Sequence, residues 1–278
     1  MKTISYLHNC NAGDLTGALA GMRQIYRDFG KKAVIYQVLD LPGQYYEGAV
    51  HTVRDEKGTQ VTMNKRIFDM LRPMLLAQDY IEDFIVYNPD QAIKIEVDLT
   101  VIRDRVNVNI PYGALPSWTL LAYPPMACDL SEPWVETPGL KVIHKSYVLI
   151  NRTQRYLNPD ISYTFLKAFQ EELLFVGTEA EHQLFCKQFK LDFPRLQVDN
   201  FLELAEVMKM CRFFIGNQSF PWNLANAMGI PRVLEMCSFA PNCEPFVGKD
   251  SYGFLHQVPL EYFFDKLHKK TGPSHEAA

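Results

Sequence analysis

Residues 213–235 read FFIGNQSFPWNLANAMGIPRVLE and place two apolar runs on either side of a polar turn and a short helical pattern. The runs at 213–216 and 232–236 are typical of buried strands, and the helix expected over 222–228 is closed by Gly229. A strand, a helix and a second strand in this order indicate a parallel sheet with a right-handed crossover. The sequence therefore predicts an α/β fold.

The polar turn before this helix is a candidate ligand site. Ser219 is a good N-cap and Pro221 suits the first turn, so the amides from Gln218 to Phe220 would face outward. Ligands of open parallel sheets bind beyond the carboxyl ends of strands, where helix N-termini attract anions. We expect Asn217, Gln218 and Ser219 to hold a diphosphate. The alternative is an ordinary capped helix without a ligand.

The alternation of strand and helix extends upstream, with strands expected at 146–151 and 173–177 and helices at 162–171, 179–190 and 202–210. Arg152 and Arg155 follow the first of these strands. Arginines at the carboxyl end of a strand suit bidentate phosphate binding, although a solvated pair of surface charges is an equal alternative. Glu235 lies in an apolar strand, where an unpaired carboxylate is costly, and this favours a contact with ribose hydroxyls.

The N-terminal part repeats the pattern, with strands expected at 2–7, 33–39 and 84–87 and helices at 15–29 and 64–77. The first strand leads into the loop HNCNAGD at 8–14, which lacks Gly-x-Gly-x-x-Gly, so a nicotinamide enzyme is disfavoured. Asp14 is a candidate general base, or only a helix cap, and Gly13 would allow close approach of a substrate. His8 is a second candidate base, or only a partner for local backbone groups.

Length and composition set the frame for these motifs. The 278 residues suggest two domains, with a linker at the end of the proline-rich stretch 110–139. A net charge of −4 argues against a surface built wholly for nucleic acid or anionic lipid, but not against a local phosphate site. Six cysteines without a Cys-x-x-Cys pair read as reduced thiols rather than a metal site. No apolar stretch is long enough for a membrane span or a signal-peptide core, so we expect a cytoplasmic protein.

Together these segments resemble the GT-B class of glycosyltransferases, and within it the heptosyltransferase-like family 9. The resemblance rests on GDLTGALAGMRQIY, on FVGTEAE and above all on FFIGNQSFPWNLANAMGIPRVLE, and it covers about 1–35 and 146–245. One departure is plain. The family's Asp-Thr/Ser-Gly-Pro-x-His turn is replaced by NQSFPW at 217–222, which lacks both the acid and the histidine.

The resemblance implies two Rossmann-like domains facing across a cleft: an acceptor domain over 1–139 and a nucleotide-sugar domain over 140–278. It implies a nucleoside-diphosphate sugar as donor and no obligatory metal. In such an enzyme Asp14 would be the base, and the leaving diphosphate would be stabilised by Arg152 or Arg155. The remaining donor contacts would come from Gly177, Gln218, Ser219 and Glu235.

The function expected from the sequence is metal-independent transfer of a hexosyl or pentosyl group to an acceptor hydroxyl. A glycan or lipid-linked glycan is the default acceptor. A hydroxylated DNA base, as in phage base-modifying glycosyltransferases, is the rival acceptor, and the net charge of −4 disfavours it. A nucleotide-sugar-binding module without turnover is the rival outside enzymology.

Overall fold

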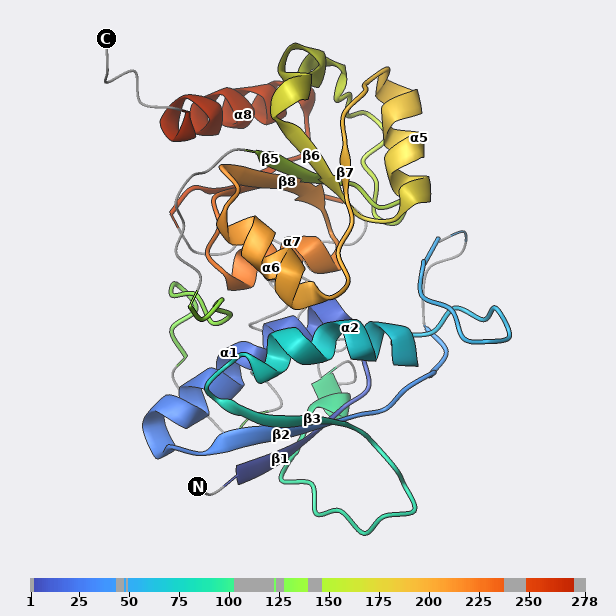
Figure 1. Ribbon diagram of the computed structural model, residues 1–278, viewed down its shortest axis with the longest axis vertical. Helices are drawn as coiled ribbons and strands as arrows, with labels where there is room; N and C mark the ends of the chain where they lie inside the picture. The colour runs from blue at the N-terminus through green and yellow to red at the C-terminus, as the bar shows by residue number, and fades with distance from the viewer. Residues whose placement is uncertain are drawn as a thin grey trace.

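A computed structural model describes residues 3–43, 48, 50–102, 123, 128–139, 147–237 and 249–272. The chain forms two parallel sheets, one on each side of a layer of helices (Figure 1). This arrangement confirms the predicted α/β class. Most of the proline-rich stretch, including the aromatic side chains before residue 123, lies outside the described residues.

The first sheet contains strands from the N-terminal part only. It has the order β3-β2-β1-β4, and every pair is parallel. Its elements are β1 (Thr3–His8), α1 (Ala12–Phe29), β2 (Lys32–Gln37), α2 (Lys65–Leu76), β3 (Ile81–Val86), β4 (Val97–Asp98) and a 3₁₀ helix (Leu99–Val101). Helix α1 begins three residues earlier than the apolar pattern predicts because Asn11 and Asp14 form a capping box, and it ends at Gly30 with φ 63°.

The second sheet contains strands from the C-terminal part only. It has the order β10-β9-β8-β5-β6-β7, again with parallel pairs. Its strands are β5 (Val148–Asn151), β6 (Leu173–Val176), β7 (Arg195–Leu196), β8 (Phe213–Asn217), β9 (Arg232–Glu235) and β10 (Ser251–Phe254). Its helices are a 3₁₀ helix (Thr164–Glu172), α5 (Glu179–Phe189), α6 (Phe201–Lys209), α7 (Phe220–Ala227) and α8 (Gln257–Thr271). The segment expected as an α-helix over 162–171 is therefore a 3₁₀ helix.

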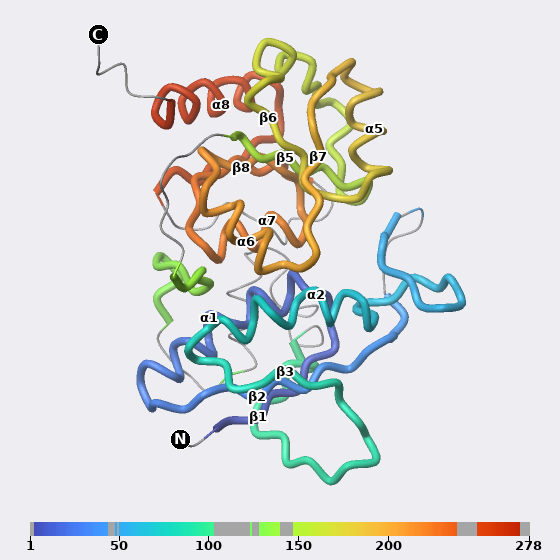
Figure 2. Tube along the Cα trace, viewed as in Figure 1, coloured from blue at the N-terminus to red at the C-terminus, as the bar shows by residue number. Residues whose placement is uncertain are grey.

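The two sheets are joined by packed helices. Helices α6 and α7 lie between the sheets and face α1 and α2, whereas α5 and α8 cover the far side of the second sheet (Figures 1 and 2). One apolar cluster runs from the first sheet through these helices to the near face of the second sheet, and another fills the space under α5 and α8. Helices α1 and α7 approach each other closely at Gly13, where a Cβ would lie 2.8 Å from Nδ2 of the Asn223 side chain.

The expected boundary between 139 and 140 stays a prediction. Strands β1 to β4 precede it and β5 to β10 follow it, but residues 140–146 lie outside the described part. Within the described ranges, no helix combines the length and the apolar character that crossing a membrane requires.

Candidate functional site

A cavity of about 600 Å³ lies at the junction of the two sheets. The carboxyl ends of β1, β5 and β6 open into it, and so does the loop 50–53 that follows β2. Cavities of 300–1,000 Å³ are typical of sites for cofactors and small substrates. This position, beyond the carboxyl ends of parallel strands, is the one expected from the sequence.

Helix N-termini converge on this cavity. The N-caps of α1, α5 and α7, which are Asn11, Thr178 and Ser219, all line it. The Ser219 hydroxyl accepts from the Trp222 amide at 3.3 Å and Pro221 lies in the first turn, which confirms the helix start expected from the sequence. Each helix N-terminus has the positive end of its dipole, but at α1 and α5 the capping-box carboxylates of Asp14 and Glu181 offset it. The first turn of α7 has no acidic residue, so the N-terminus of α7 is the one that favours an anion.

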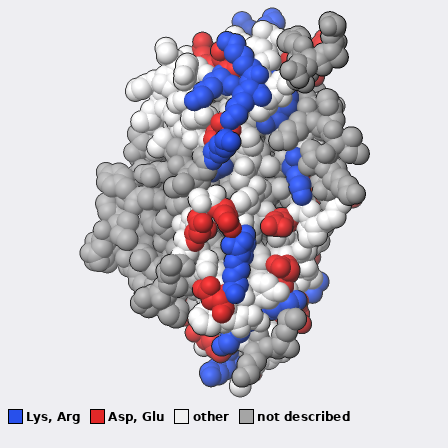
Figure 3. Space-filling view, turned by 90° about the vertical axis from the view of Figure 1, so that its left-hand side faces the viewer, with Lys and Arg blue, Asp and Glu red and all other residues white. Residues whose placement is uncertain are grey.

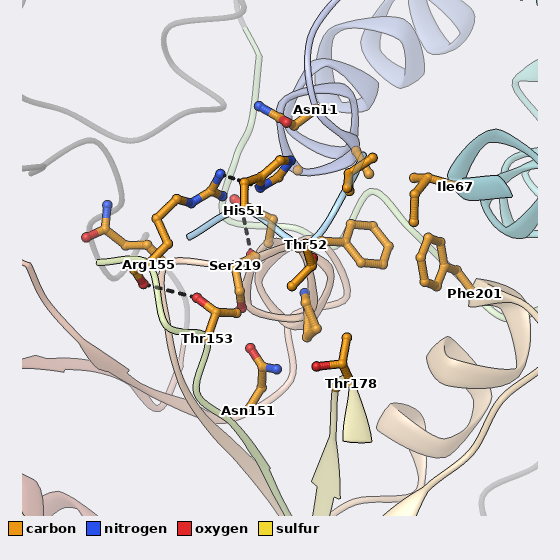
Figure 4. A pocket seen from close by; sticks show the side chains of 18 of the residues that line it. Asn11, His51, Thr52, Ile67, Asn151, Thr153, Arg155, Thr178, Phe201 and Ser219 are labelled. Carbon is orange, nitrogen blue, oxygen red and sulfur yellow. Dashed lines mark hydrogen bonds between the residues drawn. The ribbon is translucent and has the colours of Figure 1, made fainter. Parts of the chain in front are cut away.

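Arg155 adds a positive charge from the loop after β5. Its Nη1 lies 2.8 Å from Nδ1 of His51, which belongs to the loop after β2 (Figure 4). Both side chains line the cavity, and His51 is buried. Burial, and then the charge of Arg155, lower the pKa of His51 to about 4, so its imidazole is neutral at neutral pH. Sequence reasoning missed His51 because no motif or periodicity marks this loop.

We expect His51 to make the protein less stable in mild acid. A histidine whose pKa falls to about 4 on folding binds protons more readily in the unfolded chain, so stability is lost as the pH falls from about 6.5 towards 4. The loss is on the order of 1–2 kcal/mol, because the imidazole borders a cavity rather than the dry core. Urea unfolding of the wild type and His51→Gln at about pH 7 and 5 measures it. The free energy of unfolding of the wild type minus that of His51→Gln should fall from pH 7 to pH 5. A difference that stays constant would contradict the expectation.

The candidate bases His8 and Asp14 both line the cavity from the first sheet. Asp14 is half-buried, and its Oδ2 accepts from the backbone N–H and the Nδ2 of Asn11, each at 3.2 Å. His8 is buried, with Nδ1 2.7 Å from Gln37 Oε1. Asp14 is thus a helix cap that also borders the cavity, so its two predicted roles are compatible.

Arg152 and Glu235 are placed differently from the other predicted residues. Their side chains are 4% and 0% exposed and form a bidentate ion pair, with Nε–Oε2 2.8 Å and Nη2–Oε1 2.9 Å. Glu235 also accepts from the Tyr163 hydroxyl at 2.8 Å and the Asn158 amide at 2.7 Å. Neither Arg152 nor Glu235 is among the lining residues, because each satisfies the buried charge of the other. The ribose and phosphate contacts predicted for them stay predictions.

Asn217 also acts away from the cavity surface. Its Oδ1 accepts from the Thr153 amide at 2.9 Å, and its Nδ2 donates to the carbonyls of Thr153 and Arg155 at 3.0 and 2.9 Å. The side chain therefore fixes the loop that presents Arg155. Gln218 does line the cavity.

Gly177 lines the cavity as well, at φ 149°. A Cβ there would lie 2.9 Å from Phe175 and 3.1 Å from Asn151 Nδ2, so a side chain would strain the turn between β6 and α5.

One side of the cavity is apolar. We define the apolar wall as Ile67, Met70, Leu196, Val198, Phe201, Leu204 and Phe220. Figure 4 shows Ile67 and Phe201 together on the side away from Arg155 and His51. The rings of Phe201 and Phe220 lie 4.3 Å apart. The site is thus divided between an anion-binding side and a side that suits a flat apolar group such as a nucleobase.

No cluster of three or more His, Cys, Asp or Glu side chains that could hold a metal ion occurs within the described ranges. The positively charged side chains that line the cavity are those of Arg66, Arg155 and Arg195.

Comparisons with known proteins support the fold. No family model and no curated protein matches the sequence. The structure of E. coli heptosyltransferase WaaC with ADP matches with a TM-score of 0.58 at 8% identity, over 95% of this chain and 100% of that one. E. coli ADP-heptose LPS heptosyltransferase II matches with a TM-score of 0.53 at 10% identity, over 98% and 100%.

A glycosyl transferase family 9 structure from Veillonella parvula DSM 2008 matches with a TM-score of 0.52 at 10% identity, over 98% of this chain and 91% of that one. At such identities the likeness concerns the fold. The resemblance seen in the sequence is confirmed at that level, because the chain has the GT-B-like fold of the heptosyltransferases.

Proposed function

We propose that this protein is a glycosyltransferase that moves a sugar from a nucleoside-diphosphate sugar to an acceptor hydroxyl. The observation that supports it is the divided cavity, in which helix N-termini and Arg155 face an apolar wall while Asp14 borders the same space from the other sheet. A nucleoside diphosphate has the matching halves, an anionic diphosphate and a flat base. The heptosyltransferase-like fold agrees with this assignment.

The charges and the apolar wall favour one orientation of the donor. The diphosphate lies at the N-terminus of α7 beside Arg155 and Ser219, where amides and the guanidinium neutralise it. The base lies on the apolar wall near Phe201, which places the ribose between them near Thr178 and Glu181. This orientation moves the ribose contact from Glu235, proposed on sequence alone, to the start of α5. The sugar then points towards β1 and α1.

Asp14 supplies the acid–base chemistry of the transfer. Its carboxylate accepts the proton of the acceptor hydroxyl, whose oxygen attacks the anomeric carbon. The bond from that carbon to the diphosphate oxygen breaks, and the leaving diphosphate keeps the electron pair. Arg155 and the amides of α7 stabilise the charge that develops on it, which is the role a metal ion has in other transferases. This displacement inverts the anomeric carbon.

A carbohydrate or a lipid-linked glycan is the acceptor we propose. A DNA base is less well supported, because the net charge is −4 and acidic side chains lie beside the basic ones on the face that Figure 3 shows. Transfer rather than binding alone is favoured by the carboxylate that borders the donor cavity.

Thermal unfolding with a panel of nucleoside diphosphates and their sugars tests the proposal. The similar WaaC structures hold ADP and ADP-2-deoxy-2-fluoro heptose, so ADP-heptose is the first donor to try. A donor at 100 times its Kd should raise the Tm by about 5–10 °C. Arg27→Gln, which changes an exposed side chain at the far end of α1, is the control and should respond equally. A protein that no donor stabilises would contradict the proposal.

A further inference from the structure

The contact between His51 and Arg155 links the two sheets across the candidate site. His51 belongs to a loop of the first sheet and Arg155 to a loop of the second, yet Nδ1 and Nη1 lie 2.8 Å apart. His51 is 8% exposed, so its imidazole is fixed by packing rather than free to rotate in solvent. The tip of Arg155 is therefore held by the half of the molecule opposite its own backbone.

The base of Arg155 is held from its own side. Its carbonyl accepts from Asn217 Nδ2 at 2.9 Å and from the Thr153 hydroxyl at 3.0 Å, and its guanidinium lies 4.8 Å from the Tyr156 ring centroid. Tyr156 has φ 59°, a left-handed conformation that is costly for a tyrosine. Thr153 and Asn217 thus fix the backbone of the loop at Arg155. The Arg155 side chain enters the cavity near Ser219 (Figure 4).

We infer that His51 is a positioning residue for the donor diphosphate: it accepts a hydrogen bond from Arg155 and holds the guanidinium beside the N-terminus of α7. This inference rests on the proposed function. A guanidinium has five N–H donors, so Arg155 can bind an imidazole and phosphate oxygens together. Holding it in place before the donor binds removes part of the entropy cost of ordering a long side chain.

The chemistry of His51 suits this role. Guanidinium groups only donate, so the facing ring nitrogen must be an unprotonated acceptor. Burial and the neighbouring Arg155 keep the imidazole neutral at neutral pH, as its lowered pKa indicates. A carboxylate at this position would hold Arg155 too, but it would repel the diphosphate. A neutral acceptor orients the cation without cancelling its charge.

Binding of inorganic pyrophosphate, measured by calorimetry near pH 7.5, tests the inference on the full chain. We expect Arg155→Ala to weaken binding about 10–100-fold, as for loss of a charged hydrogen-bond donor. His51→Ala should weaken it about 3–10-fold, and His51→Gln, which keeps an acceptor oxygen, should restore most of the affinity. In the Arg155→Ala background, His51→Ala should change the affinity less than about 2-fold, because residues acting through one contact are not additive.

Matched variants separate positioning from damage to the fold. His256→Ala removes an exposed imidazole at the start of α8, outside the cavity lining, and should bind pyrophosphate as the wild type does. If His51→Ala does not fold, His51→Leu keeps a side chain of similar volume while it removes the acceptor and the hydrogen bond to the Val61 backbone. His51→Gln remains the variant that keeps an acceptor.

The outcomes are distinct. The inference would be overturned if a folded His51 variant without an acceptor bound pyrophosphate with wild-type affinity. It would also be overturned if His51→Ala lowered the affinity equally in the wild type and in Arg155→Ala. Either result would leave the proposed diphosphate site unchanged. A wild-type protein that does not bind pyrophosphate would overturn both.

Discussion

Replacing Asp14 by Asn should lower kcat for glycosyl transfer by about 10²–10⁴-fold, the range typical for loss of a general base. The amide cannot take up the proton of the acceptor hydroxyl. It does keep the oxygen that accepts from the Asn11 backbone N–H, so the start of α1 should be preserved. Donor affinity should change less than about 3-fold, because Asp14 is not among the residues proposed to bind the diphosphate, the ribose or the base.

Release of the nucleoside diphosphate in the presence of acceptor measures this effect, and a thermal shift with donor measures binding. Asp28→Asn, an exposed carboxylate at the end of the same helix, is the matched control and should retain wild-type turnover. Asp14→Ala removes base and cap together and should cost about 1 kcal/mol of stability in addition. Wild-type turnover in Asp14→Asn would show that Asp14 is only a cap.

His8 is the base that would then be tested. Since Gln37 Oε1 only accepts, a neutral His8 has its proton on Nδ1 and an acceptor lone pair on Nε2. His8→Gln alongside Asp14→Asn therefore distinguishes the two candidates. The larger loss of kcat identifies the group that takes the proton, and losses that do not add would indicate that both act on one proton.

Local patterns in the sequence were enough to predict most of the fold. Strands β5, β6, β8 and β9 of the second sheet were expected within about two residues, whereas β10 was not predicted. The start of α7 followed from Ser219 and Pro221. The two-residue strands β4 and β7 were missed, since so short a segment has no periodicity to detect. Helix ends shifted where a side chain caps the helix, as at Asn11.

The candidate site was less predictable, because its contacts join residues distant in sequence. The residue types and their positions after a strand or before a helix predicted that Arg155 and Ser219 would line the site. Nothing in the order of residues along the chain indicates that His51 contacts Arg155. For Glu235 the reasoning that a buried carboxylate needs a partner was sound. The partner is Arg152, which follows β5 while Glu235 ends β9, and both strands pair with β8. Sheet order, not sequence spacing, decides that pairing.

Removing either member of this ion pair should lower the free energy of unfolding by about 3–5 kcal/mol. In Glu235→Leu the buried Arg152 guanidinium loses both of its carboxylate contacts. In Arg152→Met the carboxylate, 0% exposed, keeps only the hydrogen bonds from Tyr163 and Asn158. Burial opposes the charge of Arg152, yet the hydrogen bonds and charge of Glu235 raise the pKa of the guanidinium, which shows how closely the two depend on each other. Urea unfolding measures each loss.

The double variant distinguishes a structural pair from a ribose ligand. Arg152→Met with Glu235→Leu leaves no unpaired charge, so it should recover at least about half of the single losses, as observed when buried ion pairs are replaced by apolar side chains. A carboxylate offers about four acceptor sites. Four are occupied, by Nε and Nη2 of Arg152, the Tyr163 hydroxyl and the Asn158 backbone amide, so we expect the ribose of a donor to bind elsewhere. A Glu235→Gln protein that keeps its stability but loses donor affinity more than about 10-fold would reverse this conclusion and return Glu235 to the donor site.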